Sequence, residues 1–366
     1  MHNAVDSETA KLIDERNGLR AQNPTDPHIT ELNEQINTNI KEHKRAKWLE
    51  HLNNCGPGTK TLWSTIKHLN SGPRQLENQS ISFNGKAYSK PKKIANCLNR
   101  QFTPNSTTRP TKEFRRTLRT LKKKKTSDAP ITITPTMIEA AIKKSKNSKA
   151  IGPDLLSPIM IKNLGPVAIA FLANLFTHCI NQAITPPLWK VGRIIPLPKP
   201  GKPVDEGPSY RPISLLSPLA KLLESVILPT IQSAITLKPH QHGFRKAHST
   251  VTALQSISDH ITTGLNKAKP VDRTVLVAID LSKAFDTVNH ELLLKDILDL
   301  PLNHHLKSFL AGYLRGRQTF VDFRGAKSKY RKVRQGVPQG AVLSPTLFNL
   351  YMSHMPTPPA DIKLVT

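Results

Sequence analysis

Cysteine, acidic residues and long apolar runs are all scarce in this chain. The three cysteines, Cys55, Cys97 and Cys179, are far apart and odd in number, so they indicate neither a disulfide framework nor a zinc site. A reducing intracellular compartment, cytoplasm or nucleus, is therefore expected. No apolar run approaches the ~20 residues of a membrane span. The charged N-terminus lacks a signal-peptide core, and no membrane contact is expected.

Basic residues outnumber acidic ones about two to one. The 366 residues include 53 Lys and Arg against 26 Asp and Glu, which gives a formal net charge of +27. This excess is too large for an ordinary metabolic enzyme and fits a polyanionic partner, with nucleic acid as the first candidate. A basic tail on an unrelated domain is the alternative, but the basic residues occur through most of the chain. The length allows two or more domains.

The first hundred residues predict helices and one hairpin. Residues 7–54 carry apolar side chains at spacings of three and four, and Pro24 and Pro27 break this pattern into two helices. A further short helix is expected over 59–70. The remaining expected elements are a hairpin around Asn84-Gly85, within 81–89, and a helix over 91–103.

Residues 104–130 have the composition of a linker, rich in Thr, Pro and basic residues. The run Lys122–Lys125 is a candidate for binding phosphate backbones or for nuclear localisation. A flexible, solvated segment is the commoner explanation of such a run. The character changes at Thr134, an N-cap residue followed by Pro135, after which helices and short strands alternate.

An apolar run of strand character, Val275–Ile279, ends at an acidic residue, Asp280. The run predicts a buried strand that delivers this carboxylate to its tip. Such a tip is a good place to hold Mg²⁺, because the strand is rigid and its end is open to substrate. One carboxylate does not make a metal site, so a partner acid and groups that hold a nucleotide are needed.

Two extended segments joined by a basic loop precede this strand. Val191–Leu197 predicts the first, the segment containing Arg211 predicts the second, and a helix is expected from about Ser217. Together they predict a mobile flap that closes over phosphates, with the guanidinium of Arg211 offering a fixed fork of donors. The alternative is that the basic side chains are simply exposed on a hairpin. The loop and its flanks carry Lys190, Arg193, Lys199 and Lys202.

Two further loops are candidates for contact with nucleic acid. Gln241–Thr250 is a basic turn before a helix, and it is a candidate contact for template or phosphate. Arg334–Met352 begins with a tight bend at Gly336 and Gly340 and opens into a helix. Glycines let the backbone approach a flat base or sugar closely. Gln339 supplies an amide that both donates and accepts.

The order of these motifs is specific. Along the chain they read KAIGPD, PLWK with KPGK, SYRPISLL with KLLE, QHGFR with ST, AIDLSKAFDTV and RQGVPQGAVLSPTLFNLY. This set resembles the reverse transcriptase domain of non-LTR retrotransposons and is most similar to jockey-like elements. The resemblance implies an α+β fold, a right-hand polymerase with fingers and a partial palm. The implied domains are a mainly helical pre-polymerase region at 1–103, a basic linker at 104–132 and the reverse transcriptase domain at 133–366.

The resemblance implies an RNA-directed DNA polymerase that transfers nucleotides with two Mg²⁺ ions. Asp280 matches the first of three metal-binding acids, and the backbone carbonyl of Leu281 joins its coordination. Phe285 matches an aromatic residue that lies under the sugar and rejects a 2′-hydroxyl; a core role is the alternative. The other implied nucleotide-binding residues are Lys199 (or Lys202 in the same loop), Arg211, Lys283, Ala284, Gln339 and Gly340.

The chain departs from the family pattern at two places. It has Leu155 where most relatives have the glycine of Pro-Asp-Gly, so this turn is expected to differ slightly, and Lys149 and Asp154 in the same motif are expected to be structural. Relatives continue to a Tyr-Ala-Asp-Asp hairpin whose aspartates complete the metal site, whereas this chain ends at Asp361–Thr366. We therefore expect no polymerase activity from the chain as given.

The implied partners are an RNA template, a DNA primer or target, and dNTPs. A non-catalytic nucleic-acid-binding remnant of a retroelement is the alternative function, because the net charge supports it equally well. An intron maturase shares the fold, but the region before the polymerase resembles that of jockey-like elements.

Overall fold

A computed structural model describes residues 6–54, 56, 62, 80–103, 110–123, 127–269, 273–356, 358–359 and 362–366. By packing, the chain divides into two compact units, Met1–Leu76 and Glu77–Thr366. Among the described helices, none is both long and apolar enough to cross a membrane.

The first unit contains two helices, α1 (Ser7–Gln22) and α2 (His28–Asn53), as the apolar spacing predicts. The side chain of Asp6 caps α1 by accepting a hydrogen bond from the backbone N–H of Thr9 at 2.7 Å. The break between the helices contains both predicted prolines. The helix expected over 59–70 lies outside the described residues, apart from Leu62. The buried apolar residues of α2 are Ile29, Leu32 and Ile36.

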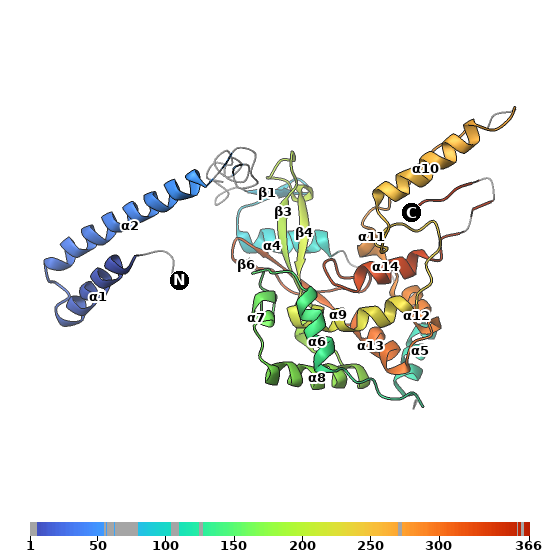
Figure 1. Ribbon diagram of the computed structural model, residues 1–366, viewed down its shortest axis with the longest axis horizontal. Helices are drawn as coiled ribbons and strands as arrows, with labels where there is room; N and C mark the ends of the chain where they lie inside the picture. Colours follow the sequence, from blue (N-terminus) through green and yellow to red (C-terminus); the bar gives the residue numbers. More distant parts are fainter. Residues whose placement is uncertain are drawn as a thin grey trace. The chain divides into compact units, whose positions relative to one another are not determined.

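The second unit is built around a mixed sheet with β3 inside it (Figure 1). β3 pairs antiparallel with β4 and parallel with β5, and β5 also pairs antiparallel with two short strands. The two extended segments and the helix predicted after them are therefore confirmed. The strands are β3 (Val191–Pro198), β4 (Tyr210–Leu215), β5 (Gln318–Phe323), β6 (Ala326–Lys327) and β7 (Arg331–Lys332).

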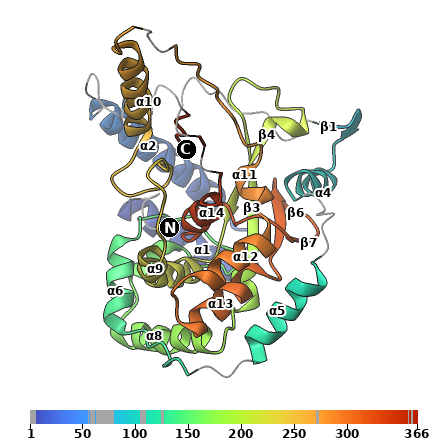
Figure 2. The ribbon, with the colours of Figure 1, turned by 90° about the vertical axis from the view of Figure 1, so that its right-hand side faces the viewer.

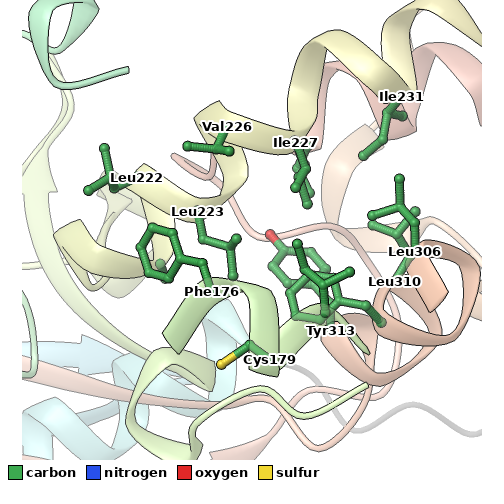
Figure 3. Close-up of a cluster of buried hydrophobic side chains, with 14 of the residues drawn as sticks. Phe176, Cys179, Leu222, Leu223, Val226, Ile227, Ile231, Leu306, Leu310 and Tyr313 are labelled. Carbon is green, nitrogen blue, oxygen red and sulfur yellow. The ribbon is translucent and has the colours of Figure 1, made fainter. Parts of the chain in front are cut away.

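A helical layer packs beside this sheet and holds the main core (Figures 1 and 2). Figure 3 shows side chains from α8, α9 and α13 meeting in one apolar cluster, with Phe176 and Tyr313 on two of these helices. The helices of the layer are α6 (Pro135–Lys144), α7 (Pro158–Lys162), α8 (Pro166–Asn181), α9 (Pro218–Ser233), α12 (His290–Asp299), α13 (His304–Leu314) and α14 (Ser344–Met352).

Helix starts follow the capping signals of the sequence. Thr134 accepts a hydrogen bond from the N–H of Met137 ahead of α6, and Ser217 accepts one from Ala220 ahead of α9. α10 (Thr250–Leu265) begins with a capping box on Ser249.

A hairpin and a helix before the polymerase motifs also belong to the second unit. They are β1 (Ile81–Phe83), β2 (Lys86–Tyr88) and α4 (Pro91–Phe102). Asn84 and Gly85 have φ values of 48° and 78°, the left-handed turn that an Asn-Gly pair predicts. Apolar residues of this segment share a core with the sheet. That core contains Ile81, Ile94, Ala95, Leu98, Ile194, Tyr210, Val321 and Phe323. Packing divides the chain near residue 76, so this hairpin and helix, which the resemblance implied to be part of a region at 1–103, pack with the residues that follow them.

The linker prediction is wrong for residues 112–123, which form helix α5 (Lys112–Lys123). Leu118 of this helix is buried against Leu294 and Ala311. At its start the N–H and hydroxyl of Thr111 donate to the carboxylate of Glu291 at 2.6 and 3.1 Å. Although the composition of this segment is mostly basic, α5 carries a narrow stripe of apolar side chains, and such a stripe is enough for an amphipathic helix to pack against a core. Lys122–Lys125 lies outside the residues whose side chains are described.

The buried strand predicted over Val275–Ile279 is also not found. The segment forms no strand or helix, and the exposed fractions of Val275 and Ile279 are 84% and 85%. An apolar segment becomes a buried strand only when a neighbouring strand takes up its backbone N–H and C=O groups. Among the described strands, β3 pairs with β4 on one side and β5 on the other, and none of these strands pairs with this segment.

Candidate functional site

The strongest candidate site is a pocket of about 980 Å³ in the second unit. It is an open pocket lined by residues of the β1–β2 hairpin, α4 and the β3–β4 strands. Its lining also includes the turn before α11 (Ala284–Thr287) and the loop before α14. Its volume is in the range of ligand sites for molecules of nucleotide size. Of the residues that the sequence assigns to nucleotide binding, it gathers Lys199, Arg211, Lys283 and Gln339.

The charge of this pocket is strongly positive. Its lining contains five basic side chains and one carboxylate, Asp286, which gives a formal charge of +4. A concave site with this excess concentrates anions and favours a polyphosphate ligand. The basic residues are Lys86, Arg100, Lys199, Arg211 and Lys283.

The β3–β4 loop presents one of its two candidate lysines to the pocket. Lys199 lines it and is fixed by two hydrogen bonds, from its N–H to the Ser209 carbonyl at 2.7 Å and from its Nζ to the Pro208 carbonyl at 2.8 Å. Lys202 is exposed and is not among the lining residues. Lys199 is therefore the better candidate for the phosphate-binding role.

Asp286 and Gln339 join two sequence motifs across the pocket wall. The Nε2 of Gln339 donates a hydrogen bond to Oδ1 of Asp286 at 3.0 Å. Burial raises the pKa of Asp286, while the hydrogen bond from Gln339 and the charge of Lys283 act in the opposite direction. This bond uses one of the two hydrogens on Nε2, so the second N–H and the amide oxygen of Gln339 remain available to a ligand.

Backbone contacts fix the same two motifs against each other. The N–H of Gly336 donates to the carbonyl of Val288, and the N–H of Val337 donates to the carbonyl of Phe285, both at 2.8 Å. Gly336 has a φ of 85°, and a Cβ there would lie 2.8 Å from the carbonyl oxygens of Phe285 and Asp286. Only glycine fits this close approach, which explains the predicted glycine bend.

Three of the sequence-predicted residues lie near the pocket without lining it. Phe285 is half-buried, and its ring lies between those of Phe244 and Phe348, with centroids at 5.6 and 4.9 Å. It packs against the main core, which is the alternative that sequence reasoning left open. Ala284 is half-buried. Gly340 has a φ of 85°, and a Cβ atom at this position would lie 3.1 Å from the carbonyl oxygen of Ser214.

The predicted metal ligands are not brought to the pocket. Asp280 and Leu281 lie on the exposed segment after Val275. In the part of the chain that the structure describes, no group of three His, Cys, Asp or Glu side chains is placed to hold a metal ion. Asp361 lies outside the described residues. The residues described here therefore do not assemble a site for two Mg²⁺ ions.

Three other predicted basic residues have structural partners. Arg193 forms an ion pair with Asp322, with Nη2 to Oδ2 at 2.8 Å, and Lys190 donates its Nζ to the Gly312 carbonyl at 2.7 Å. In the turn at Gln241–Thr250, Arg245 donates to the Lys238 carbonyl at 3.0 Å. None of these three residues lines the pocket, so they are poor candidates for phosphate binding there.

A buried carboxylate supports the loop that carries Gln339. Glu224 of α9 is 3% exposed and accepts hydrogen bonds from the N–H groups of Val342 and Leu343 and from the hydroxyl of Tyr313. Figure 3 shows the Tyr313 hydroxyl pointing toward α9. Burial raises the pKa of Glu224, and the nearby charge of Arg317 lowers it less. Glu224 is the last residue of the KLLE motif, but the motif alone predicts no role for it.

Sequence reasoning missed two pocket residues, Lys86 and Arg100. They lie in the hairpin and in α4, before the motifs that point to chemistry. Nothing in their local sequence distinguishes them from other exposed basic residues, because only the tertiary fold brings them to the pocket.

The comparisons with known proteins agree with the motifs. The family model described as reverse transcriptase (RNA-dependent DNA polymerase) matches residues 197–365. The probable RNA-directed DNA polymerase from transposon X-element of Drosophila melanogaster is 37% identical over 245 residues, 65% of this chain and 26% of that protein. That from transposon BS of the same species is 31% identical over 364 residues, 94% of this chain and 39% of that protein.

A third relative names the element type directly. The RNA-directed DNA polymerase from mobile element jockey of Drosophila melanogaster is 31% identical over 333 residues. This match covers 87% of the present chain and 35% of the jockey protein. The chain thus spans well under half the length of these relatives. By its motifs and its relatives, it belongs to the jockey-like reverse transcriptases of non-LTR retrotransposons.

Proposed function

We propose that the second unit binds an incoming dNTP as part of an RNA-directed DNA polymerase of a non-LTR retrotransposon. The single observation that carries this proposal is the basic pocket. Residues from three separate motifs, represented by Arg211, Lys283 and Gln339, line one cavity together with Lys199. Phosphoryl transfer depends mainly on positioning and charge neutralisation, which this set of side chains supplies.

The proposal assigns the pocket to the junction of fingers and palm in a right-hand polymerase. The β3–β4 flap with Lys199 and Arg211 is the fingers side, and the turn at Lys283 with the Gln339 loop is the palm side. RNA template and DNA primer would approach along the strongly basic surface of the chain. Ala284, Phe285 and Gly340 remain candidates for contact with the sugar and base.

The proposal includes a divalent metal, with Asp280 as one ligand and the carbonyl of Leu281 as another. Such an ion neutralises charge on the transferred phosphoryl group. Because the described residues do not assemble a complete metal site, no catalytic step is assigned to the metal in this chain.

Nucleotide binding tests the proposal directly. We expect Arg211→Gln and Lys199→Gln each to weaken dATP binding about tenfold, since each removes a charge-assisted contact to phosphate. Lys202→Gln is the matched control from the same loop and should leave the affinity unchanged. Equilibrium dialysis with labelled dATP measures all three. Equal effects of the Lys199 and Lys202 substitutions would contradict the assignment of the pocket.

Primer extension tests the expected inactivity of this chain. With Mg²⁺, an RNA template and an annealed DNA primer, we expect no extension by this chain, because the described residues assemble no complete metal site around Asp280. Asp280→Ala is the control. A signal from the chain that disappears in the control would overturn the expected inactivity.

A further inference from the structure

The wall of the pocket formed by the β1–β2 hairpin and α4 precedes the family match at 197–365 and carries two basic side chains. We propose that Lys86 and Arg100 contact the phosphates of the bound nucleoside triphosphate. The dNTP site then extends beyond the polymerase domain into the preceding segment. This inference rests on the proposed function and names residues that neither the motifs nor the family match assign.

Helix α4 is a fixed part of the pocket because it is hydrogen-bonded to the sheet. The Nδ2 of Asn99 donates to Oγ of Ser328 at 2.9 Å and to the carbonyl of Lys329 at 2.8 Å. Asn99 is also 1% exposed, so these bonds are shielded from water. At the end of the helix, Thr103 and Thr319 share a hydrogen bond between their hydroxyls at 2.8 Å. Arg100 therefore lies on a rigid helix, next to Asn99, whose side chain is held by hydrogen bonds to the sheet region.

The hairpin is joined to the flap that carries Lys199. The N–H of Ser82 donates to the Asp205 carbonyl at 2.6 Å, and the Nε2 of Gln101 donates to the Gly207 carbonyl at 3.0 Å. Gly207 has no room for a side chain, because a Cβ there would lie 2.2 Å from the ring of Phe83. Any movement of the flap over a ligand would therefore involve the hairpin, which carries Lys86.

The basic side chains of this wall have no acidic partner. Neither Lys86 nor Arg100 forms an ion pair or a side-chain hydrogen bond with another described residue, and both are exposed. This contrasts with Arg193, which is neutralised by Asp322. The single carboxylate of the pocket, Asp286, is already engaged by Gln339.

The guanidinium of Arg100 and the ammonium group of Lys86 line the same pocket as the two basic side chains of the flap. Such a set of cations suits an extended polyphosphate. A nucleoside triphosphate carries several negative charges within a length that such a pocket can hold. A polynucleotide spreads its charges along a strand, so it would have to thread the pocket to meet all of these side chains. We therefore assign the wall to the triphosphate.

The test compares ligand binding by Lys86→Gln, Arg100→Gln and the double variant in the full chain. Lys93→Gln is the matched control, since Lys93 is an exposed lysine on α4 outside the pocket. The probes are dATP, deoxyadenosine and a single-stranded RNA oligonucleotide. We expect each single variant to weaken dATP binding about five- to tenfold and the double variant more, with deoxyadenosine binding unchanged. Thermal denaturation establishes that each variant is folded.

The outcomes separate this inference from the proposed function. Loss of dATP affinity in Arg211→Gln but not in Lys86→Gln or Arg100→Gln would overturn the inference and leave the proposed function standing. A loss of RNA binding with unchanged dATP binding would assign the wall to a nucleic acid strand and overturn it as well. If the unaltered chain binds no dATP, the proposed function fails and the inference fails with it.

Discussion

A leucine occupies a glycine-like conformation in the Gly-Pro-Asp turn. Leu155 has a φ of 63° and is 74% exposed. The turn around it closes through the N–H of Gly152, which donates to the Leu156 carbonyl at 3.0 Å. The resemblance implies glycine at this position, and the backbone of Leu155 lies in the left-handed region that favours glycine. The cost of a left-handed L-residue is therefore still present.

We expect Leu155→Gly to stabilise the protein by about 0.5–1 kcal/mol. The relief of left-handed strain is worth roughly 1–2 kcal/mol and the extra flexibility of unfolded glycine cancels part of it. Urea denaturation measures the free energy of unfolding. Ile151→Gly, in the same turn but at a negative φ, is the control and should destabilise. A destabilised Leu155→Gly would show that the exposed leucine side chain contributes more than its strained backbone costs.

A second residue-scale feature is the buried carboxylate of Glu224. Its pKa is raised above 4.5 because burial outweighs the charge of Arg317 and the three hydrogen bonds that it accepts. Between the unfolded and the folded pKa, the folded protein binds more protons than the unfolded chain. The contribution of Glu224 to the free energy of unfolding therefore falls as pH rises through this window.

Glu224→Gln should remove this pH dependence, since the amide does not titrate. We expect the difference in unfolding free energy, unaltered chain minus variant, to decrease as pH rises above about 4.5, the ordinary pKa of a glutamate side chain. Urea denaturation across this range measures it. Tyr313→Phe is a useful companion variant, because it removes one hydrogen bond and keeps the carboxylate. A difference that is constant with pH would contradict the raised pKa.

At the scale of elements, whether a segment forms a helix or a strand depends on packing against neighbouring elements more than on its composition. Residues 112–123 are basic enough to be taken for a linker, but Leu118 and its apolar neighbours Phe114 and Leu121 bind α5 to α12 and α13. The opposite holds for Val275–Ile279, which is apolar enough for a strand but has no partner among the described strands. An element forms when its apolar face and its backbone groups are satisfied by neighbours.

Leu118→Ala should loosen α5. Truncating a buried leucine costs about 2–4 kcal/mol where the site cannot collapse, and α5 has few other buried residues to hold it. Hydrogen exchange of the α5 amides should rise well above that of α8. Thr120→Ala, on the exposed side of the same helix, is the control and should change little. Unchanged exchange in Leu118→Ala would mean that Thr111 and Glu291 alone hold the helix.

At the scale of the whole molecule, charge governs association. The formal net charge of +27 attracts polyanions at long range and does so without sequence preference. Several of the basic side chains line the pocket, whereas others, such as Arg193 beside Asp322, are neutralised in ion pairs within the protein. Binding to single-stranded RNA should therefore be largely electrostatic.

The logarithm of the RNA association constant should fall linearly with the logarithm of salt concentration. If at least three phosphates are neutralised, the slope is about −2 or steeper. Fluorescence anisotropy with a labelled oligonucleotide measures it. An uncharged methylphosphonate oligonucleotide of the same sequence is the control and should bind weakly with little salt dependence. A flat response for the RNA would contradict electrostatic binding.

The sequence by itself determined the elements whose signals are local and the family to which the chain belongs. Capping residues and the Asn-Gly turn set the ends of α6, α9 and the β1–β2 hairpin, because each depends on neighbours along the chain. The ordered motifs predicted that Lys199, Arg211, Lys283 and Gln339 bind a nucleotide, and the structure places these four residues around one pocket.

Only the tertiary structure decided which charges are free and which segments are docked. It paired Arg193 with Asp322, placed Lys199 rather than Lys202 at the pocket, and brought Arg100 to it from a segment about one hundred residues earlier than Lys199. It also left Asp280 on an exposed segment. These outcomes depend on contacts between residues far apart in the chain, and local patterns carry no information about which distant surface will be buried against which.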